Sequence, residues 1–459
     1  MANTKISRTK GVSTDLKKFT LSLWFKRARL GEATASSHCL YMNYLDGNNR
    51  SYAELEGGST GDTIYFFDKY GSSRVDKRTT RYFKDTNGWY HFLIKCDTTQ
   101  ATEAHRWRLY INGIEETSFA GTGTMPAQNA SMGWQGASAS NEHNFGMKES
   151  SNSPFEGCMS HIHYCDGYAY DPTEFGEFDS VTGIWKIKTA PSVNYGTQGY
   201  FVLKDGNSVT DQSGNSNNFS VTGTLTKTED CPSNVFNTLN VNDRRNTSLE
   251  IYNGNTVVSG AGGGDTGLRS TISPSKGKWY WEMKADNTGN SVGIMKQGIQ
   301  LVDSMLDSTP SSNAWGLQSI SSGVKTNVYT NGTFTSYTAG SGNNFPNWGS
   351  SDVLCCAMDL DNGKIFFGKN GTFYDNDGNT GDPVNGTNPT FSGLTTGVNY
   401  SVYVENRSGS SNASMFNFGN GYFGTTAVSS AGTNASNLGI FEHNVPAGFT
   451  AICTKGLNL

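Results

Sequence analysis

The sequence predicts an all-β fold: two antiparallel β-sandwich (jelly-roll) domains in tandem, with little helix. Apolar residues recur at every second position in many short runs, which is the period of a half-buried strand. Turn clusters separate these runs, and glycine accounts for 55 of 459 residues, above its usual share of ~7%. No long run has the 3.6-residue apolar period of a helix, so we expect less than about 10% helix.

Four strands are expected in the first half of the chain, at residues 19–26, 89–97, 107–113 and 155–163. In the first of them Phe19, Leu21, Leu23 and Phe25 fall on one face, which we expect in the core, while the alternate residues form a semi-exposed face. Gly113 is expected to close a hairpin. The order of these strands resembles a laminin-G or concanavalin-like jelly roll, and the resemblance implies a recognition domain.

The second half has a different set of strands. Trp279, Trp281 and Met283 share one face of a strand, and the run 357–371 contains two strands joined at Asn362-Gly363, a dipeptide typical of hairpin turns. This block resembles the SPRY (B30.2-like) domain. We therefore expect three segments along the chain: a laminin-G/concanavalin-like domain at 1–225, a connector at 226–250 and a SPRY-like domain at 251–459.

The boundary region has a recognisable motif, Asp-x-Ser-Gly-Asn-x-Asn-Asn-Phe, at residues 211–219. A laminin-G-like sandwich, this motif and a SPRY-like sandwich, in that order, resemble virion proteins of tailed marine bacteriophages. The resemblance runs from about residue 15 to the C-terminus. It implies a virion location after synthesis in the host cytoplasm, contact with other virion proteins, and a homotrimer, since phage fibres and spikes are commonly three-fold.

Charge and hydropathy disfavour several classes of partner. The net charge is −5 and the basic residues are scattered, whereas nucleic-acid binding needs a clustered basic face. No apolar run reaches the ~18 residues of a membrane span, and the N-terminus lacks the apolar region of a signal peptide. We expect neither nucleic-acid binding nor membrane insertion.

The eight cysteines show no C-x-x-C spacing, so we expect reduced thiols rather than a zinc site or a disulfide framework. Cys355 and Cys356 are adjacent in a predicted strand and should point to opposite faces.

No catalytic motif is present, and we predict no catalytic residue, metal or cofactor. His161 and His163 share a strand face but lack a third ligand, and we expect them to be partly exposed. Glu54 and Glu56 form the one alternating acid pair of the first half, the pattern that a retaining glycosidase would require. The Asx-rich segment 375–382 does not fit an EF-hand loop, so we expect backbone-bonded turns there.

Aromatic residues in the polar, glycine-rich part of the second half are the candidate ligand-binding residues: Trp315, Tyr329, Tyr337 and Trp348. Flat rings in such loops can stack on sugars at little cost in side-chain entropy. The alternative is that each ring fills the open end of the sandwich.

The leading hypothesis is a bacteriophage fibre or spike subunit that binds a host-surface glycan or protein and performs no chemistry. A capsid decoration or vertex fibre protein is the alternative within viruses. A glycan-degrading enzyme of concanavalin-like fold is the alternative from another class, and a cellular adhesion protein is a third. The sequence names neither the host receptor nor the place of attachment on the particle, and it does not decide whether calcium binds.

Overall fold

The computed structural model describes residues 4–30, 37–58, 61–136, 142–148, 153–204, 208–245, 249–260, 266–286, 289–301, 312–319, 326–335, 344–406 and 413–458. The chain divides into two compact units, residues 1–227 with 231–233 and residues 228–230 with 234–459. The predicted all-β class is confirmed. Three 3₁₀ turns, η3 (Glu103–His105), η4 (Pro172–Glu174) and η5 (Gly456–Asn458), are complete within the described ranges, and no α-helix is present there.

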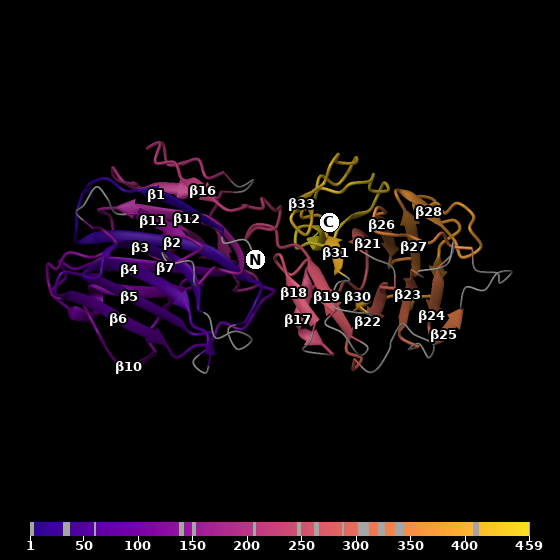
Figure 1. Ribbon diagram of the computed structural model, residues 1–459, viewed down its shortest axis with the longest axis horizontal. Helices are drawn as coiled ribbons and strands as arrows, with labels where there is room; N and C mark the ends of the chain where they lie inside the picture. The colour runs from indigo at the N-terminus through magenta and orange to yellow at the C-terminus, as the bar shows by residue number, and fades with distance from the viewer. Residues whose placement is uncertain are drawn as a thin grey trace. The chain divides into compact units, whose positions relative to one another are not determined.

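The first unit is built on two large antiparallel sheets (Figure 1). The eight-stranded sheet contains, in spatial order, β10 (Phe119–Thr124), β6 (Ser73–Thr79), β5 (Ile64–Tyr70), β4 (Asn49–Leu55), β3 (His38–Asp46), β11 (Glu142–Phe145), β1 (Lys5–Thr9) and β16 (Ser220–Thr222). The six-stranded sheet contains β15 (Tyr200–Val202), β12 (Gly157–Asp166), β2 (Lys18–Arg27), β7 (Tyr90–Asp97), β8 (Trp107–Ile111) and β9 (Ile114–Glu116). A separate hairpin pairs β13 (Gly176–Phe178) with β14 (Trp185–Ile187).

Alternation along each strand fills the core between these sheets. Phe19, Leu21, Leu23 and Phe25 of β2 all lie in one buried cluster, as their spacing predicts. Trp134 packs in the same cluster and stacks on the ring of His143, 3.9 Å between centroids.

The other face of the six-stranded sheet is also buried, which corrects the semi-exposed face expected from the sequence. Residues 167–200 cover it, and Trp185 of the β13–β14 hairpin donates from Nε1 to Nδ1 of His91 at 3.0 Å. Trp185 lies so close to Gly113 that a Cβ there would meet the indole at 2.4 Å. His161 and His163 are 0% and 2% exposed, so the expectation of partly exposed histidines is wrong. Burial lowers the pKa of His91 to about 3 and the pKa of His163 well below its usual value.

The second unit also pairs two large sheets. One contains seven strands: β17 (Leu239–Arg244), β20 (Thr266–Ser270), β30 (Tyr400–Asn406), β22 (Ser291–Lys296), β23 (Ala314–Gln318), β24 (Asn327–Thr330) and β25 (Thr333–Thr335). The other contains nine: β18 (Leu249–Tyr252), β19 (Val257–Gly260), β31 (Ala413–Asn417), β21 (Lys278–Ala285), β26 (Leu354–Asp359), β27 (Lys364–Lys369), β28 (Thr372–Tyr374), β29 (Phe391–Ser392) and β34 (Thr450–Ala451). A small hairpin joins β32 (Tyr422–Phe423) to β33 (Thr426–Ala427).

The expected connector at 226–250 is largely part of this second unit. β17 pairs with β20, β18 pairs with β19, and Phe236 is buried in a cluster with the C-terminal residues. The sequence did not predict these strands, because the segment is rich in turn residues. The strands have few apolar residues, and those residues pack against partners far along the chain.

Both faces of the nine-stranded sheet are buried. Trp279, Trp281 and Met283 of β21 face the main core as predicted, while Tyr280 faces a second cluster formed with the C-terminal segment. Cys356 and Cys355 of β26 divide between the two clusters in the same way, which confirms their predicted opposite directions. All eight cysteines lie among the described residues, and none of them forms a disulfide.

A buried carboxylate fastens the C-terminal segment to this sheet. Glu282 of β21 is 0% exposed. It accepts hydrogen bonds from the backbone N–H groups of Glu442 and His443, both at 2.8 Å, and from the Tyr280 hydroxyl at 3.0 Å. Burial is the largest influence and raises the pKa of Glu282 to about 7.

The raised pKa of Glu282 predicts a pH-dependent stability of the second unit. The folded state holds this proton more tightly than the unfolded chain, whose reference pKa is 4.5. The stabilisation is therefore complete below pH 4.5 and is lost as pH rises through about 7, at no more than ~1.4 kcal/mol per pH unit. Urea unfolding followed by hydrogen exchange of β21 at pH 5 and at pH 7.5 measures this loss. Glu282→Gln should reduce the difference between the two pH values, and an unchanged difference would contradict the assignment.

Candidate functional site

Three of the four aromatic residues proposed from the sequence as ligand-binding are described, and all three are buried. Trp315 lies in β23, Tyr329 in β24 and Trp348 before β26, with exposed fractions of 2%, 0% and 1%. Tyr337 lies outside the described residues. The expectation of surface rings is therefore wrong for the three that are described, and the alternative, that they fill the sandwich, describes their placement.

Trp315 and Tyr329 are buried because they lie in strands, where alternate side chains point to opposite faces of the sheet. The composition of this segment had suggested loops instead. Trp315 points into the main core and meets the ring of Tyr400 at 5.8 Å, and Trp348 belongs to the same cluster. Tyr329 points to the opposite face of its sheet, where its hydroxyl donates to Oε1 of Gln318 at 2.8 Å. The many glycine, serine and asparagine residues around β23 and β24 made these two short strands difficult to predict.

The two glutamates that the sequence offered as a glycosidase pair each form an ion pair within the first unit. Glu54 pairs with Lys148 at 2.9 Å, and Glu56 pairs with Arg78 at 2.5 Å. Among the described residues, no three histidine, cysteine or acidic side chains lie close enough together to hold a metal ion.

The segment 375–382 forms the Asx turns that were expected. Asp375 accepts the backbone N–H groups of Asp377 and Asn379, and Asp382 accepts those of Val384 and Asn385.

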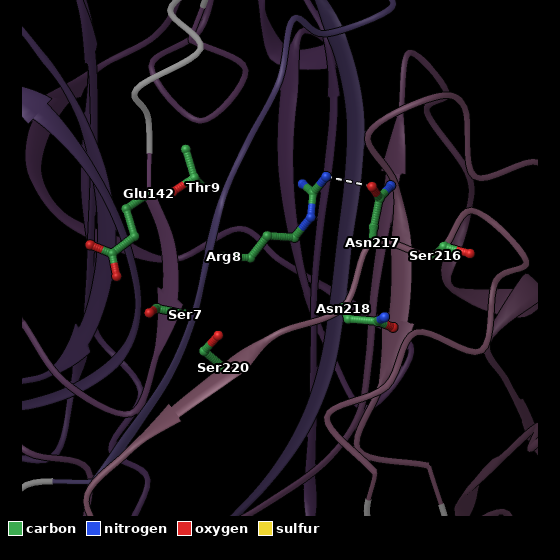
Figure 2. A pocket seen from close by; sticks show the side chains of 8 residues that line it. All are labelled: Ser7, Arg8, Thr9, Glu142, Ser216, Asn217, Asn218 and Ser220. Atoms are coloured by element: carbon green, nitrogen blue, oxygen red, sulfur yellow. Dashed lines mark hydrogen bonds between the residues drawn. The ribbon is translucent and has the colours of Figure 1, made fainter.

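A polar pocket of about 330 Å³ lies at one edge of the eight-stranded sheet (Figure 2). Its lining comes from β1, β11, β16 and the loop before β16: Ser7, Arg8, Thr9, Glu142, Ser216, Asn217, Asn218 and Ser220. The lining consists almost entirely of hydroxyl, amide and charged groups, which is the composition that binds a ligand through hydrogen bonds rather than through apolar contact.

The pocket exists because the pairing of β16 stops early. β16 covers β1 only from Lys5 to Ser7, so the edge of β1 beyond Ser7 is left to the preceding loop. Ile6 of β1 points into the core, and alternation therefore places Ser7 and Thr9 on the outer face of the sheet. Glu142 is the register partner of Thr9 and shares that face.

The loop that completes the pocket is the motif at residues 211–219. Asp211 organises it by accepting the backbone N–H groups of Phe201, Ser213 and Asn217 at 2.8 to 2.9 Å. Asn217 then donates from Nδ2 to the carbonyl oxygen of Gly199 at 2.8 Å. The motif is visible in the sequence, where it marks the boundary region between the two domains. In the structure it builds one wall of the pocket.

Two opposite charges lie in the pocket and do not neutralise each other directly. Figure 2 shows the Arg8 guanidinium pointing toward Asn217, whose Oδ1 accepts its hydrogen bond, and the Glu142 carboxylate turned away from that guanidinium. Nη1 of Arg8 is buried and makes no hydrogen bond within the described residues. Burial lowers the pKa of Arg8. Burial opposes ionisation of Glu142 as well, but hydrogen bonds from Ser7 and Lys5 outweigh it and lower the pKa of Glu142.

Two domain families match the chain. Residues 2–163 match the concanavalin A-like lectin/glucanases superfamily, and residues 278–395 match the SPRY domain. The chain joins a concanavalin A-like domain to a SPRY domain. No curated protein matches it in sequence. The pocket lies on strands of the concanavalin A-like domain together with the motif loop beyond residue 163.

Solved structures similar to parts of the chain include two SPRY domains and a pentraxin. The SPRY domain of human HERC1 is 17% identical, with a TM-score of 0.28, and the match covers 39% of this chain and 96% of that one. The TRIM65 PSpry domain is 16% identical, with a TM-score of 0.28, over 39% of this chain and 90% of that one. A heptameric SAP-like pentraxin from Limulus polyphemus is 12% identical, with a TM-score of 0.27, over 37% of this chain and 72% of that one. Similarities at this level identify neither a ligand nor a partner.

The burial of Trp315 predicts a structural phenotype. Trp315→Ala should destabilise the SPRY domain by about 3–5 kcal/mol, the cost of truncating a large core aromatic residue, as measured by urea unfolding. Tyr82→Ala is the matched control, because Tyr82 is 58% exposed and its loss should change stability by no more than about 0.5 kcal/mol. An equally small effect at Trp315 would contradict its place in the core.

Proposed function

We propose that the protein is a bacteriophage virion subunit, a fibre or spike component that binds a host-surface glycan through its concanavalin A-like domain and performs no chemistry. The observation that supports it most is the polar pocket at the edge of the eight-stranded sheet, with hydroxyl, amide and charged groups facing one small cavity. The viral assignment rests on the order of the two domains and the intervening motif. Localisation in the virion and assembly with other virion proteins belong to the same proposal.

The chemistry of the pocket favours a sugar over other small ligands. A pyranose presents hydroxyl groups that both donate and accept, and the pocket offers acceptors at Glu142 and donors at Arg8, with serine and asparagine groups that serve as either. A volume near 330 Å³ is at the lower end of the range typical of ligand sites, ~300–1,000 Å³. One terminal sugar residue is a suitable occupant.

Binding at a single pocket should be weak. Each hydrogen bond contributes only about 0.5–1.5 kcal/mol net, so a handful of them gives a dissociation constant on the order of 1 mM. A homotrimer, and many copies on one particle, would raise the avidity by about 10² to 10⁴ without any new contact. Multivalent display is therefore part of the proposal.

Blocking the pocket should abolish adsorption to host cells. Ser220 is an exposed residue of the lining, so Ser220→Trp fills the cavity while leaving the core intact. We expect adsorption of tagged protein to host cells to fall about tenfold or more, because the tryptophan occupies the space of the sugar. Flow cytometry with labelled oligomer measures it.

Ser180→Trp is the matched control, since Ser180 is also exposed but lies in the β13–β14 turn. Equal adsorption by both variants and the unchanged protein would exclude the pocket as the receptor site. If the unchanged protein fails to adsorb to the host of the phage, the alternative of a capsid decoration protein replaces the proposal.

A further inference from the structure

The outer face of the eight-stranded sheet has a second concentration of binding groups, several strands away from the pocket. Tyr52 of β4 and Phe67 of β5 are register partners, with ring centroids 5.3 Å apart and planes inclined by 23°. Tyr65 of β5 lies on the same face, 6.0 Å from the ring of Tyr52. Alternation makes these rings outward-facing, because Phe66 between them points into the core.

Cationic side chains lie against these rings. Arg50 and Arg74 lie over Phe67, with the guanidinium carbon 5.0 and 5.2 Å from the ring centroid. On either side, Arg78 lies 5.5 Å from the centroid of Tyr65 and Lys148 lies 4.2 Å from that of Tyr52. The two arginines cover Phe67, which is 5% exposed, whereas Tyr52 and Tyr65 remain partly exposed. We call these three rings and four cations the aromatic–cation surface. All of these residues except Lys148 belong to β4, β5 and β6, which lie side by side in Figure 1.

Three of the four cations already have carboxylate partners. Lys148 and Arg78 pair with the nearly buried Glu54 and Glu56, and Arg74 pairs with Asp76.

The remaining positive charges of this face are those of Arg50 and Lys69. Arg50 forms no ion pair in the described part of the chain, and its Nε is buried without a hydrogen bond. Lys69 of β5 donates to the amide oxygen of Asn48 at 2.7 Å, and its charge also acts on the Asp46 carboxylate. With Asp46 counted, the five cations of this face exceed its carboxylates by one.

One wall of the pocket, formed by Ser7, Thr9 and Glu142, shares a sheet face with the aromatic–cation surface. In the sheet order, β11 and β3 separate β1 from β4, so the two sites are about 14 Å apart at ~4.8 Å per strand. A saccharide of a few residues covers that distance.

At the pocket end Lys5 pairs with Glu142 at 3.0 Å. Arg8, which alternation places on the inner side of β1, interacts with Asp211 and Asp166.

We infer that this face binds an acidic polysaccharide, one with carboxylate groups along its chain, whose end occupies the pocket and whose body lies across the aromatic–cation surface. Guanidinium groups bind carboxylates as donors, and flat rings and guanidinium planes both stack on pyranose faces. One excess charge among five cations suits a chain whose carboxylates are at least one sugar apart. It is too little for the dense phosphates of a nucleic acid. The inference rests on the proposed glycan binding and specifies its ligand class.

The test uses the full-length protein with immobilised polygalacturonate and, as a neutral polymer of equal length, dextran, in biolayer interferometry. We expect polygalacturonate to bind about tenfold more tightly than dextran at 50 mM salt, with the difference shrinking as salt rises because exposed charges are screened. The double variant Arg50→Gln/Lys69→Gln should lose about fivefold in affinity for polygalacturonate. Lys186→Gln, a half-exposed cation on the hairpin that covers the other sheet, should lose none.

Equal affinity for the two polymers, or an unchanged affinity in the double variant, would overturn the inference. Equally tight binding of poly-glutamate would also overturn it, since that polymer has the charge without the sugar. As a second variant, Tyr65→Leu keeps every charge and should weaken polygalacturonate binding about threefold. Host adsorption that depends on Ser220 but is indifferent to Arg50 and Lys69 would retain the proposed function and reject the acidic ligand.

Discussion

The burial of both faces of a single sheet is the constraint on which each unit depends. In the first unit residues 167–200 cover the outer face of the six-stranded sheet, and in the second the C-terminal segment covers the nine-stranded sheet. Polar side chains beneath these covering segments need hydrogen-bond partners, because a buried polar group without one reduces the folding stability by about 1–3 kcal/mol. His91 meets Trp185, and Glu282 meets the backbone of residues 442 and 443. The buried polar groups thus fasten the covering segments.

This constraint also decides where the first unit can bind a ligand. Its six-stranded sheet is covered, whereas the eight-stranded sheet presents Tyr52, Tyr65 and Arg74 to solvent. Ser7, Thr9 and Glu142 place one wall of the pocket on the same face. We propose that this wall and the cations beside Tyr52 and Tyr65 act together as one recognition surface.

The alternation of apolar and polar residues along the strands made the fold predictable from the sequence. It did not reveal the pocket. The core faces of β2 and β21, and the opposite directions of Cys355 and Cys356, follow from the two-residue period alone. What covers a second sheet face depends on segments far away in sequence, so the burial of His163 could not be predicted. Composition misled at Trp315 and Tyr329, because a glycine-rich neighbourhood was interpreted as a loop. The motif at 211–219 was noticed, but its contact with Arg8 arises only in the folded chain.

The central claim is that recognition takes place on the open face of the eight-stranded sheet. Hydrogen-exchange mass spectrometry of the protein with and without purified host-surface polysaccharide tests it most directly. The account predicts slower exchange in β1, in the loop at 211–219 and in β4 to β6, with β23 and β24 of the second unit unchanged. Slower exchange confined to the SPRY domain would contradict it.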